Sequence, residues 1–357
     1  MKRAVKKEAP KLSEQVKRSH EARSKPQEEK KYDGDFGSPI STGSTLLDLA
    51  ISGGMVQGGG LPGGILVEIF GPSSAGKTVL LCEIAGNVQR AKGDIMFHDP
   101  EARLNKTFAR IFDFDTDKIA YTNPDTVTEV FKEVRAWKPN GEKGCTNGIF
   151  TDSLAALSTD LEMDSEDGDK MGMRRAKEFS EQLRVTARIL TKQKLLMVCS
   201  NQIRENAGAV GYGEKHISPG GKAIGFYASL RLRAKSVDKI HSKTTVAGKE
   251  VKRVIGVKTE FEVYKSSIWK PFRSAPVYII FDYGIDDVRA NLQYIKDYTK
   301  NTIYTCGAEI PLDKSMEISI QMVEENGYEK RLRRQVIKLW EEIESKFETE
   351  RKPKQRV

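Results

Sequence analysis

The chain has 357 residues, of which 38% are hydrophobic and 31% charged, and its formal net charge is +9. No run of about 18 consecutive apolar residues could cross a bilayer, and the basic N-terminus lacks the apolar core of a secretory signal. We therefore expect a cytoplasmic protein without a membrane partner. The positive charge favours contact with a polyanion, although a solvated basic surface accounts for it equally well. The four cysteines and four histidines are too scattered for a disulfide framework or a zinc site.

The first segment, residues 1–37, is polar and basic. Residues 1–36 hold eleven Lys or Arg against seven Asp or Glu, with few large apolar side chains. Such a composition cannot bury enough apolar surface to form a core. We predict a flexible basic arm or a single exposed helix, set off from a folded core that begins at residue 38.

Residues 38–286 alternate short apolar runs with helical patterns and Gly-rich turns. Residues 65–70, 95–97, 149–151 and 195–200 have the length and composition of strands. Between them, residues 127–137 carry apolar side chains at helical spacing, introduced by the capping pattern Thr126-x-x-Glu129. Alternation of strand and helix predicts an α/β fold whose central sheet is mostly parallel and covered on both faces.

The C-terminal part is predicted to form a small α/β subdomain over residues 287–350. Its clearest signal is an apolar series that steps by three and four residues, which indicates a long amphipathic helix. The series consists of Leu332, Val336, Leu339, Ile343 and Phe347. Residues 351–357 are basic and are expected to form a solvated tail.

One segment fits the phosphate-binding pattern G-x-x-x-x-G-K-[ST] at every fixed position. Its glycines let backbone N–H groups surround phosphates, its lysine reaches the β and γ oxygens, and its final hydroxyl can bind Mg²⁺. A chance Gly-rich turn is the alternative. The segment follows an expected strand and opens an expected helix over residues 79–91, which favours the phosphate site. It reads Gly71, Pro72, Ser73, Ser74, Ala75, Gly76, Lys77 and Thr78.

Two carboxylates complete the chemistry that such a loop needs. Asp152 ends an apolar strand and is a candidate Mg²⁺ partner beside Thr78, although an Asp in that place is also a common helix cap. Glu101 follows the strand 95–97 and is a candidate for orienting or deprotonating water, with an ordinary helix-start glutamate as the alternative.

With these pieces in place, the chain resembles the RecA family of recombinases over residues 40–285. The resemblance implies a RecA-type core that hydrolyses ATP with Mg²⁺ in a DNA-dependent way. It further implies a helical filament with ATP between subunits, and roles in recombination, DNA repair and the SOS response. Expected partners are single- and double-stranded DNA, further copies of the chain, and recombination mediators or a single-strand-binding protein. The matching segments are 40–44, 58–64, 67–72, 152–157, 201–204 and 226–232.

The resemblance also implies roles for individual residues. Glu101 matches the water-activating glutamate and Gln202 the glutamine that senses the γ-phosphate. Phe108 stands where a tyrosine often stacks on adenine. Lys265 matches the first of two lysines that reach the neighbour's ATP. The second position holds Ser267, which makes Lys270 a candidate substitute.

Two segments correspond to the DNA loops of the family, residues 162–175 and 205–222. The second is Gly-rich with one aromatic side chain, and without the matching segments around it an ordinary surface loop would be the better interpretation. As a DNA loop, it would place backbone amides and a lysine on phosphates and stack its tyrosine on bases. The DNA-binding candidates are Lys170, Met171, Arg174, Arg175, Arg204, Tyr212, Lys215 and Lys222.

Two other functions use the same core. A hexameric helicase-type or regulatory ATPase is the first, but residues 1–36 are too short for the separate N-terminal domain of a helicase. A scaffold gated by nucleotide binding is the second, and the presence of Glu101 disfavours it.

Overall fold

The computed structural model describes residues 38–160, 171–205, 216–217, 222–307 and 310–351. Its centre is a nine-stranded sheet with the strand order β11-β10-β9-β8-β1-β5-β4-β2-β3. From β8 to β3 every neighbouring pair is parallel, which confirms the mostly parallel sheet expected from the sequence. The parallel strands before β8 are β1 (Leu66–Gly71), β2 (Ile95–His98), β3 (Ala120–Thr122), β4 (Gly148–Thr151) and β5 (Leu196–Gln202).

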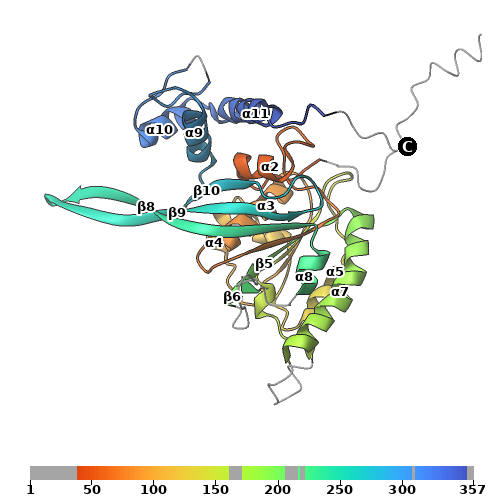
Figure 1. Ribbon diagram of the computed structural model, residues 1–357. Coiled ribbons are helices and arrows are strands. Elements are labelled where there is room, and N and C mark those ends of the chain that lie inside the picture. The colour runs from red at the N-terminus through yellow and green to blue at the C-terminus, as the bar shows by residue number, and fades with distance from the viewer. Residues whose placement is uncertain (1–37, 161–170, 206–215, 218–221, 308–309, 352–357) are drawn as a thin grey trace, which may run out of the picture. The chain divides into compact units, whose positions relative to one another are not determined.

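The other part of the sheet is antiparallel and was not anticipated from the sequence. It comprises β8 (Leu230–Val246), β9 (Lys249–Ser266), β10 (Ser274–Ile280) and β11 (Gly284–Ile285). The turn between β8 and β9 is Ala247-Gly248, with positive φ at both residues, as a tight hairpin turn requires. Figure 1 shows the outer part of this hairpin projecting beyond the strands beside it.

Helices cover both faces of the sheet, as predicted (Figure 1). Successive residues of β1 enter different cores: Val67 belongs to the core that contains Leu80 of α3, whereas Leu66 belongs to the core that contains Val130 of α5 and Phe179 of α7. The predicted capping box at the start of α5 is present. One face carries α2 (Thr45–Ser52) and α3 (Lys77–Arg90). The other face carries α5 (Val127–Ala136), α7 (Met171–Gln193) and α8 (Lys222–Tyr227).

The C-terminal subdomain is helical, so the α/β expectation for residues 287–350 was wrong. Its described residues form α9 (Asp287–Tyr298), α10 (Met316–Glu325) and α11 (Glu329–Ser345), with an isolated bridge and no strand. Runs of Glu, Lys, Arg, Leu and Ile favour helix there. Helix α11 buries Leu332 and Val336 as predicted, but Phe347 lies past its end and is 79% exposed.

Buried polar contacts join this subdomain to α2. Asp287 of α9 accepts hydrogen bonds from the backbone N–H and the hydroxyl of Thr45, each at 2.7 Å. Arg333 of α11 lies 3.3 Å from the buried Asp48. Burial raises the pKa of Asp48 to about 6, against the hydrogen bonds that it accepts and the Arg333 charge. Within the described ranges, none of the helices combines the length and the apolar character of a bilayer span.

Candidate nucleotide site

The phosphate-binding pattern forms a loop between β1 and the first turn of α3. Gly76 has a φ of 80°, and a Cβ on it would lie 2.1 Å from Cδ1 of Ile279, so this position requires glycine. No side chain caps the start of α3. The N–H groups of its first turn therefore face the loop without a side-chain acceptor, an arrangement that suits an anionic phosphate.

Lys77 is folded into the same loop. Its Nζ donates to the carbonyl oxygens of Gly71 at 3.1 Å and Pro72 at 2.6 Å. Burial lowers the pKa of Lys77, and the charge of Asp152 opposes that shift. The loop is also tied to β9, because Thr259 donates its buried hydroxyl to the carbonyl of Ala75 at 3.1 Å. The ammonium group is thus held at the mouth of the phosphate loop.

Asp152 and Thr78 meet as the sequence predicts for a magnesium site. The Thr78 hydroxyl donates to Oδ2 of Asp152 at 2.7 Å, and the Ser200 hydroxyl donates to Oδ1. Burial raises the pKa of Asp152, these hydrogen bonds oppose the rise, and the charges of Glu101 and Asp99 add to it. A hydroxyl and a carboxylate with excess negative charge nearby are what Mg²⁺ needs, since it takes its other ligands from phosphates and water.

Glu101 lies beside this group. The Ser153 hydroxyl donates to Oε1 of Glu101 at 3.0 Å, and Arg103 pairs with the other oxygen. The segment that carries Glu101 is fixed by Asp99, which accepts the backbone N–H of Leu104 at 2.7 Å and the hydroxyl of Tyr121 at 3.0 Å. Because Ser153 follows Asp152 directly, one short segment connects the candidate metal ligand with the candidate water-activating carboxylate.

Phe108 and Gln202, the two other nucleotide-site candidates, come from separate elements. Phe108 lies on the short helix α4 (Lys106–Arg110), half-buried, with its ring 5.0 Å from that of Phe112 in an edge-on arrangement. Gln202 is the last residue of β5 and its side chain is exposed. Its backbone N–H is held at 3.0 Å by the side-chain oxygen of Asn201. Adenine stacking by Phe108 and phosphate sensing by Gln202 stay predictions.

Lys265 lies in β9 and binds within its own chain to α8. Its Nζ donates to the carbonyls of Gly225 and Phe226, both at 2.9 Å. Burial lowers the pKa of Lys265, and the neighbouring Arg231 charge lowers it further. Ser267 is exposed just past the strand, and Nζ of Lys270 lies 5.5 Å from the centroid of the Trp269 ring.

A family model described as the RecA N-terminal domain matches residues 27–286. The chain belongs to the RecA family. It is 31% identical over 293 residues to Protein RecA of Caldanaerobacter subterraneus subsp. tengcongensis, covering 80% of each chain. It is 34% identical over 252 residues to Protein RecA of Thermus thermophilus, covering 70% of this chain and 68% of the relative. The chain is thus a RecA-type recombinase, a DNA-dependent ATPase that uses ATP with Mg²⁺, as expected from its sequence.

The two segments expected to form DNA loops lie largely outside the described residues. That holds for Lys170, Tyr212 and Lys215, and for the side chains of the other DNA-binding candidates. The backbone of Met171, Arg174 and Arg175 is helical, so the expected loop 162–175 extended too far. Its end reads MGMRRAKEF, a run of good helix formers that joins α7.

The second loop is also more regular at its base than expected. Two short strands, β6 (Arg204–Glu205) and β7 (His216–Ile217), pair antiparallel, and α8 already begins at Lys222. The β-branched Ile217 opposite Arg204 favours such a pairing, a signal too short to stand out in the sequence.

Sequence reasoning also missed the side chains that hold the nucleotide group in place. Ser153 orients Glu101, Ser200 holds Asp152, and Thr259 anchors the phosphate loop. Ser153 lies within the matching segment 152–157 and Ser200 directly precedes the segment 201–204, which was a weak signal. Thr259 is separated from the loop by 184 residues, and nothing local in the sequence connects the two.

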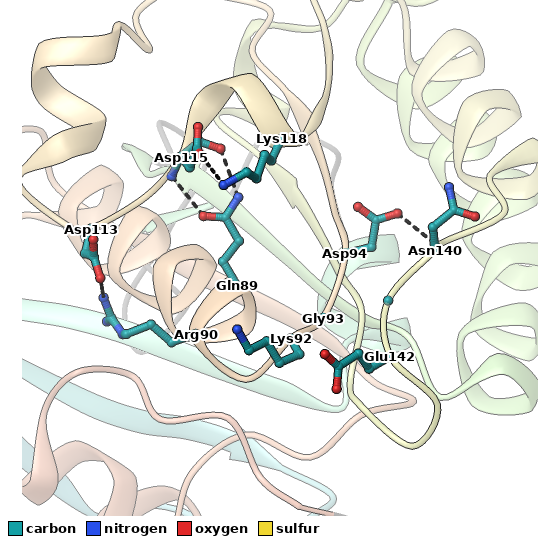
Figure 2. Close-up of a pocket in the computed structure, with 11 residues that line it drawn as sticks. Gln89, Arg90, Lys92, Gly93, Asp94, Asp113, Asp115, Lys118, Asn140 and Glu142 are labelled. Atoms are coloured by element: carbon teal, nitrogen blue, oxygen red, sulfur yellow. Dashed lines mark hydrogen bonds and ion pairs between the residues drawn. The ribbon is translucent and has the colours of Figure 1, made fainter.

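A pocket of about 450 Å³ lies elsewhere (Figure 2). Its lining includes Gln89, Arg90, Asp115 and Lys118, and no residue of the phosphate loop. Gln89 and Arg90 end the 14-residue helix α3, so the pocket is about 20 Å from the helix start at a rise of about 1.5 Å per residue. The pocket is therefore not the nucleotide site.

Proposed function

We propose that this RecA family member hydrolyses ATP with the group formed by Lys77, Thr78, Asp152 and Glu101. The observation that carries the proposal is the continuous contact from Thr78 through Asp152 and Ser153 to Glu101 at the phosphate loop. A phosphate-binding loop alone can serve as a scaffold. A fixed carboxylate beside the metal ligand adds the capacity for hydrolysis.

Each residue has a distinct task in this proposal. The N–H groups at the start of α3 and the ammonium of Lys77 stabilise the charge that grows on the phosphate oxygens. Thr78 and Asp152 hold Mg²⁺, which supplies further neutralisation of the phosphates when bound. Glu101 orients the attacking water and takes its proton, and Ser153 with Arg103 keeps that carboxylate in place.

Assembly and DNA binding form the second part of the proposal. Lys265 acts on the ATP of the neighbouring subunit in a helical filament, where a fixed cation in trans stabilises the growing charge. Its contacts with α8 in place of its own phosphate loop support this assignment. Gln202 senses the γ-phosphate and passes the signal to the DNA loop that follows it. Recombination mediators and a single-strand-binding protein are proposed partners.

An ATPase assay with and without single-stranded DNA, combined with negative-stain imaging in an ATP analogue, tests this function. We expect strong stimulation by DNA, and helical filaments that require both DNA and nucleotide. Rings would favour the helicase-type alternative. Nucleotide binding without hydrolysis or assembly would favour the scaffold.

A further inference from the structure

Glu68 is a fully buried carboxylate that the nucleotide group does not use. It lies in the middle of β1, three residues before the phosphate loop, and its side chain has 0% exposure. A buried charge is costly to desolvate unless it is paired and hydrogen-bonded. Here Oε2 lies 2.6 Å from Nε of Arg231, and Oε1 accepts from Nδ2 of Asn201 at 3.0 Å.

Arg231 is held from several sides. Its guanidinium carbon lies 4.4 Å from the ring centroid of Phe70 and 5.3 Å from that of Tyr264, and its side chain is 16% exposed. In the sheet, Arg231 of β8 is directly opposite both Glu68 of β1 and Lys265 of β9. Arg231 therefore lies in register between Glu68 and the proposed intersubunit lysine.

Asn201 makes the corresponding connection on the other side of Glu68. Its amide nitrogen donates to Glu68, and its amide oxygen accepts the backbone N–H of Gln202 at 3.0 Å. With its nitrogen fixed by the carboxylate, the amide can turn only its oxygen toward Gln202. Glu68 thus sets the conformation at the end of β5, where the exposed Gln202 side chain leaves the sheet.

We propose that Glu68 is a positioning residue that couples Gln202, through Asn201, to Lys265, through Arg231. This inference rests on the proposed roles of Gln202 and Lys265. Sheet stability alone does not call for this arrangement, because well-packed apolar residues replace buried ion pairs without loss in many proteins. A charged carboxylate between an amide and a guanidinium specifies their relative orientation, which a coupling between two strand ends requires.

The test is the isosteric variant Glu68→Gln. We expect normal ATP binding, with DNA-stimulated turnover at least tenfold lower and half-maximal stimulation shifted to higher DNA concentration. The matched control is Glu262→Gln, which removes another ion pair of the same sheet, Lys235–Glu262 at 2.9 Å, with a carboxylate that is 12% exposed. This control should keep its DNA stimulation within twofold of wild type.

A second variant, Arg231→Lys, keeps the positive charge but loses the planar fork that lies over Phe70. We expect the same loss of DNA stimulation, and no further loss in the double variant, since both changes break one connection. All assays are run below the melting temperature found by circular dichroism. Normal stimulation in either folded variant, additive losses, or failure of both variants to fold would overturn the coupling. Absence of DNA stimulation in the wild type would instead overturn the proposed function.

Discussion

The two ends of helix α3 lie against the same sheet but differ in how their polar groups are satisfied. At the start, the N–H groups of the phosphate loop lack a side-chain cap, and Asp152 lies near two further carboxylates. At the other end, several polar groups pair with one another (Figure 2). Gln89 exchanges hydrogen bonds of 2.9 and 2.8 Å with the backbone of Asp115, and Lys118 pairs with the Asp115 carboxylate at 2.8 Å.

This difference separates a binding site from a mere cavity. The pocket at the far end has volume, but several of its charged groups already have protein partners, as in the Arg90–Asp113 and Lys118–Asp115 pairs. The phosphate loop contributes to none of the described pockets, yet its donors and carboxylates need an anion and a cation. Variants at the two ends of α3 should therefore differ sharply in effect.

The largest difference is expected between two lysines. Lys77→Ala removes the ammonium at the growing phosphate charge and should lower ATP turnover by roughly 10²- to 10³-fold or more. Lys118→Ala, in the far pocket, removes only an exposed ion pair and should leave turnover within about twofold. Steady-state phosphate release measures both. Equal losses at the two ends would break the comparison.

Glu101→Gln separates hydrolysis from nucleotide binding. The amide keeps the shape of Glu101 but cannot take a proton, so turnover should fall by roughly 10²-fold or more while ATP-dependent filaments still form. Glu142→Gln, on the rim of the far pocket, is the control and should behave as wild type. Phosphate release and negative-stain imaging on the same samples give the answer. Normal turnover of Glu101→Gln would remove this residue from the mechanism.

The sequence predicts the phosphate loop at the start of α3, but not the residues that surround this loop in the fold. The phosphate loop, four of the five parallel strands before β8, the capping box of α5 and most of α11 follow from local patterns of glycine and apolar spacing. The β8–β9 hairpin was missed because its outer residues are mixed Lys, Thr and Val without clear alternation. The Glu68 network was missed because its partners lie 133 and 163 residues away. Distant polar pairing leaves no local signal.

A third prediction asks whether Lys265 acts on the nucleotide bound at the start of α3 in its own subunit or in the neighbouring subunit. Lys265→Ala should bind ATP normally but lose DNA-stimulated turnover by about tenfold or more. Mixing it with Lys77→Ala subunits should restore part of the activity, because some interfaces then pair an intact phosphate loop with an intact Lys265. Lys258→Ala, on the same strand, is the control. A loss that mixing never rescues would place Lys265 in its own site.

The smallest expected effect is on stability and comes from Glu83, which lies between the two ends of α3. Burial raises the pKa of Glu83 from 4.5 to about 7, against the charge and hydrogen bond of Arg90, and Asp287 adds to the rise. The unfolded chain ionises above about 4.5 and the folded chain only above about 7, so the Glu83 contribution to stability falls as the pH rises between these values.

The variant Glu83→Gln should remove this loss of stability with rising pH. We compare the free energy of unfolding of the variant with that of wild type at each pH. The difference, variant minus wild type, should be about 1 to 3 kcal/mol larger at pH 8 than at pH 4.5. Urea titrations at both pH values measure it. Asp113→Asn, which alters an exposed partner of the same arginine, should show no such dependence. A pH-independent difference for Glu83→Gln would contradict the assignment.

The central position of β1 has a consequence during synthesis. Its neighbours are β5 and β8, and Glu68 meets Arg231 163 residues later. At roughly 5–20 residues per second, β1 waits about 8 to 30 s on the ribosome before its second neighbour has been made. Both edges of this apolar strand are open until β5 has been made, and one edge stays open until β8 follows, which invites pairing with other chains. A nascent chain therefore exposes an unpaired edge of its central strand until β8 emerges.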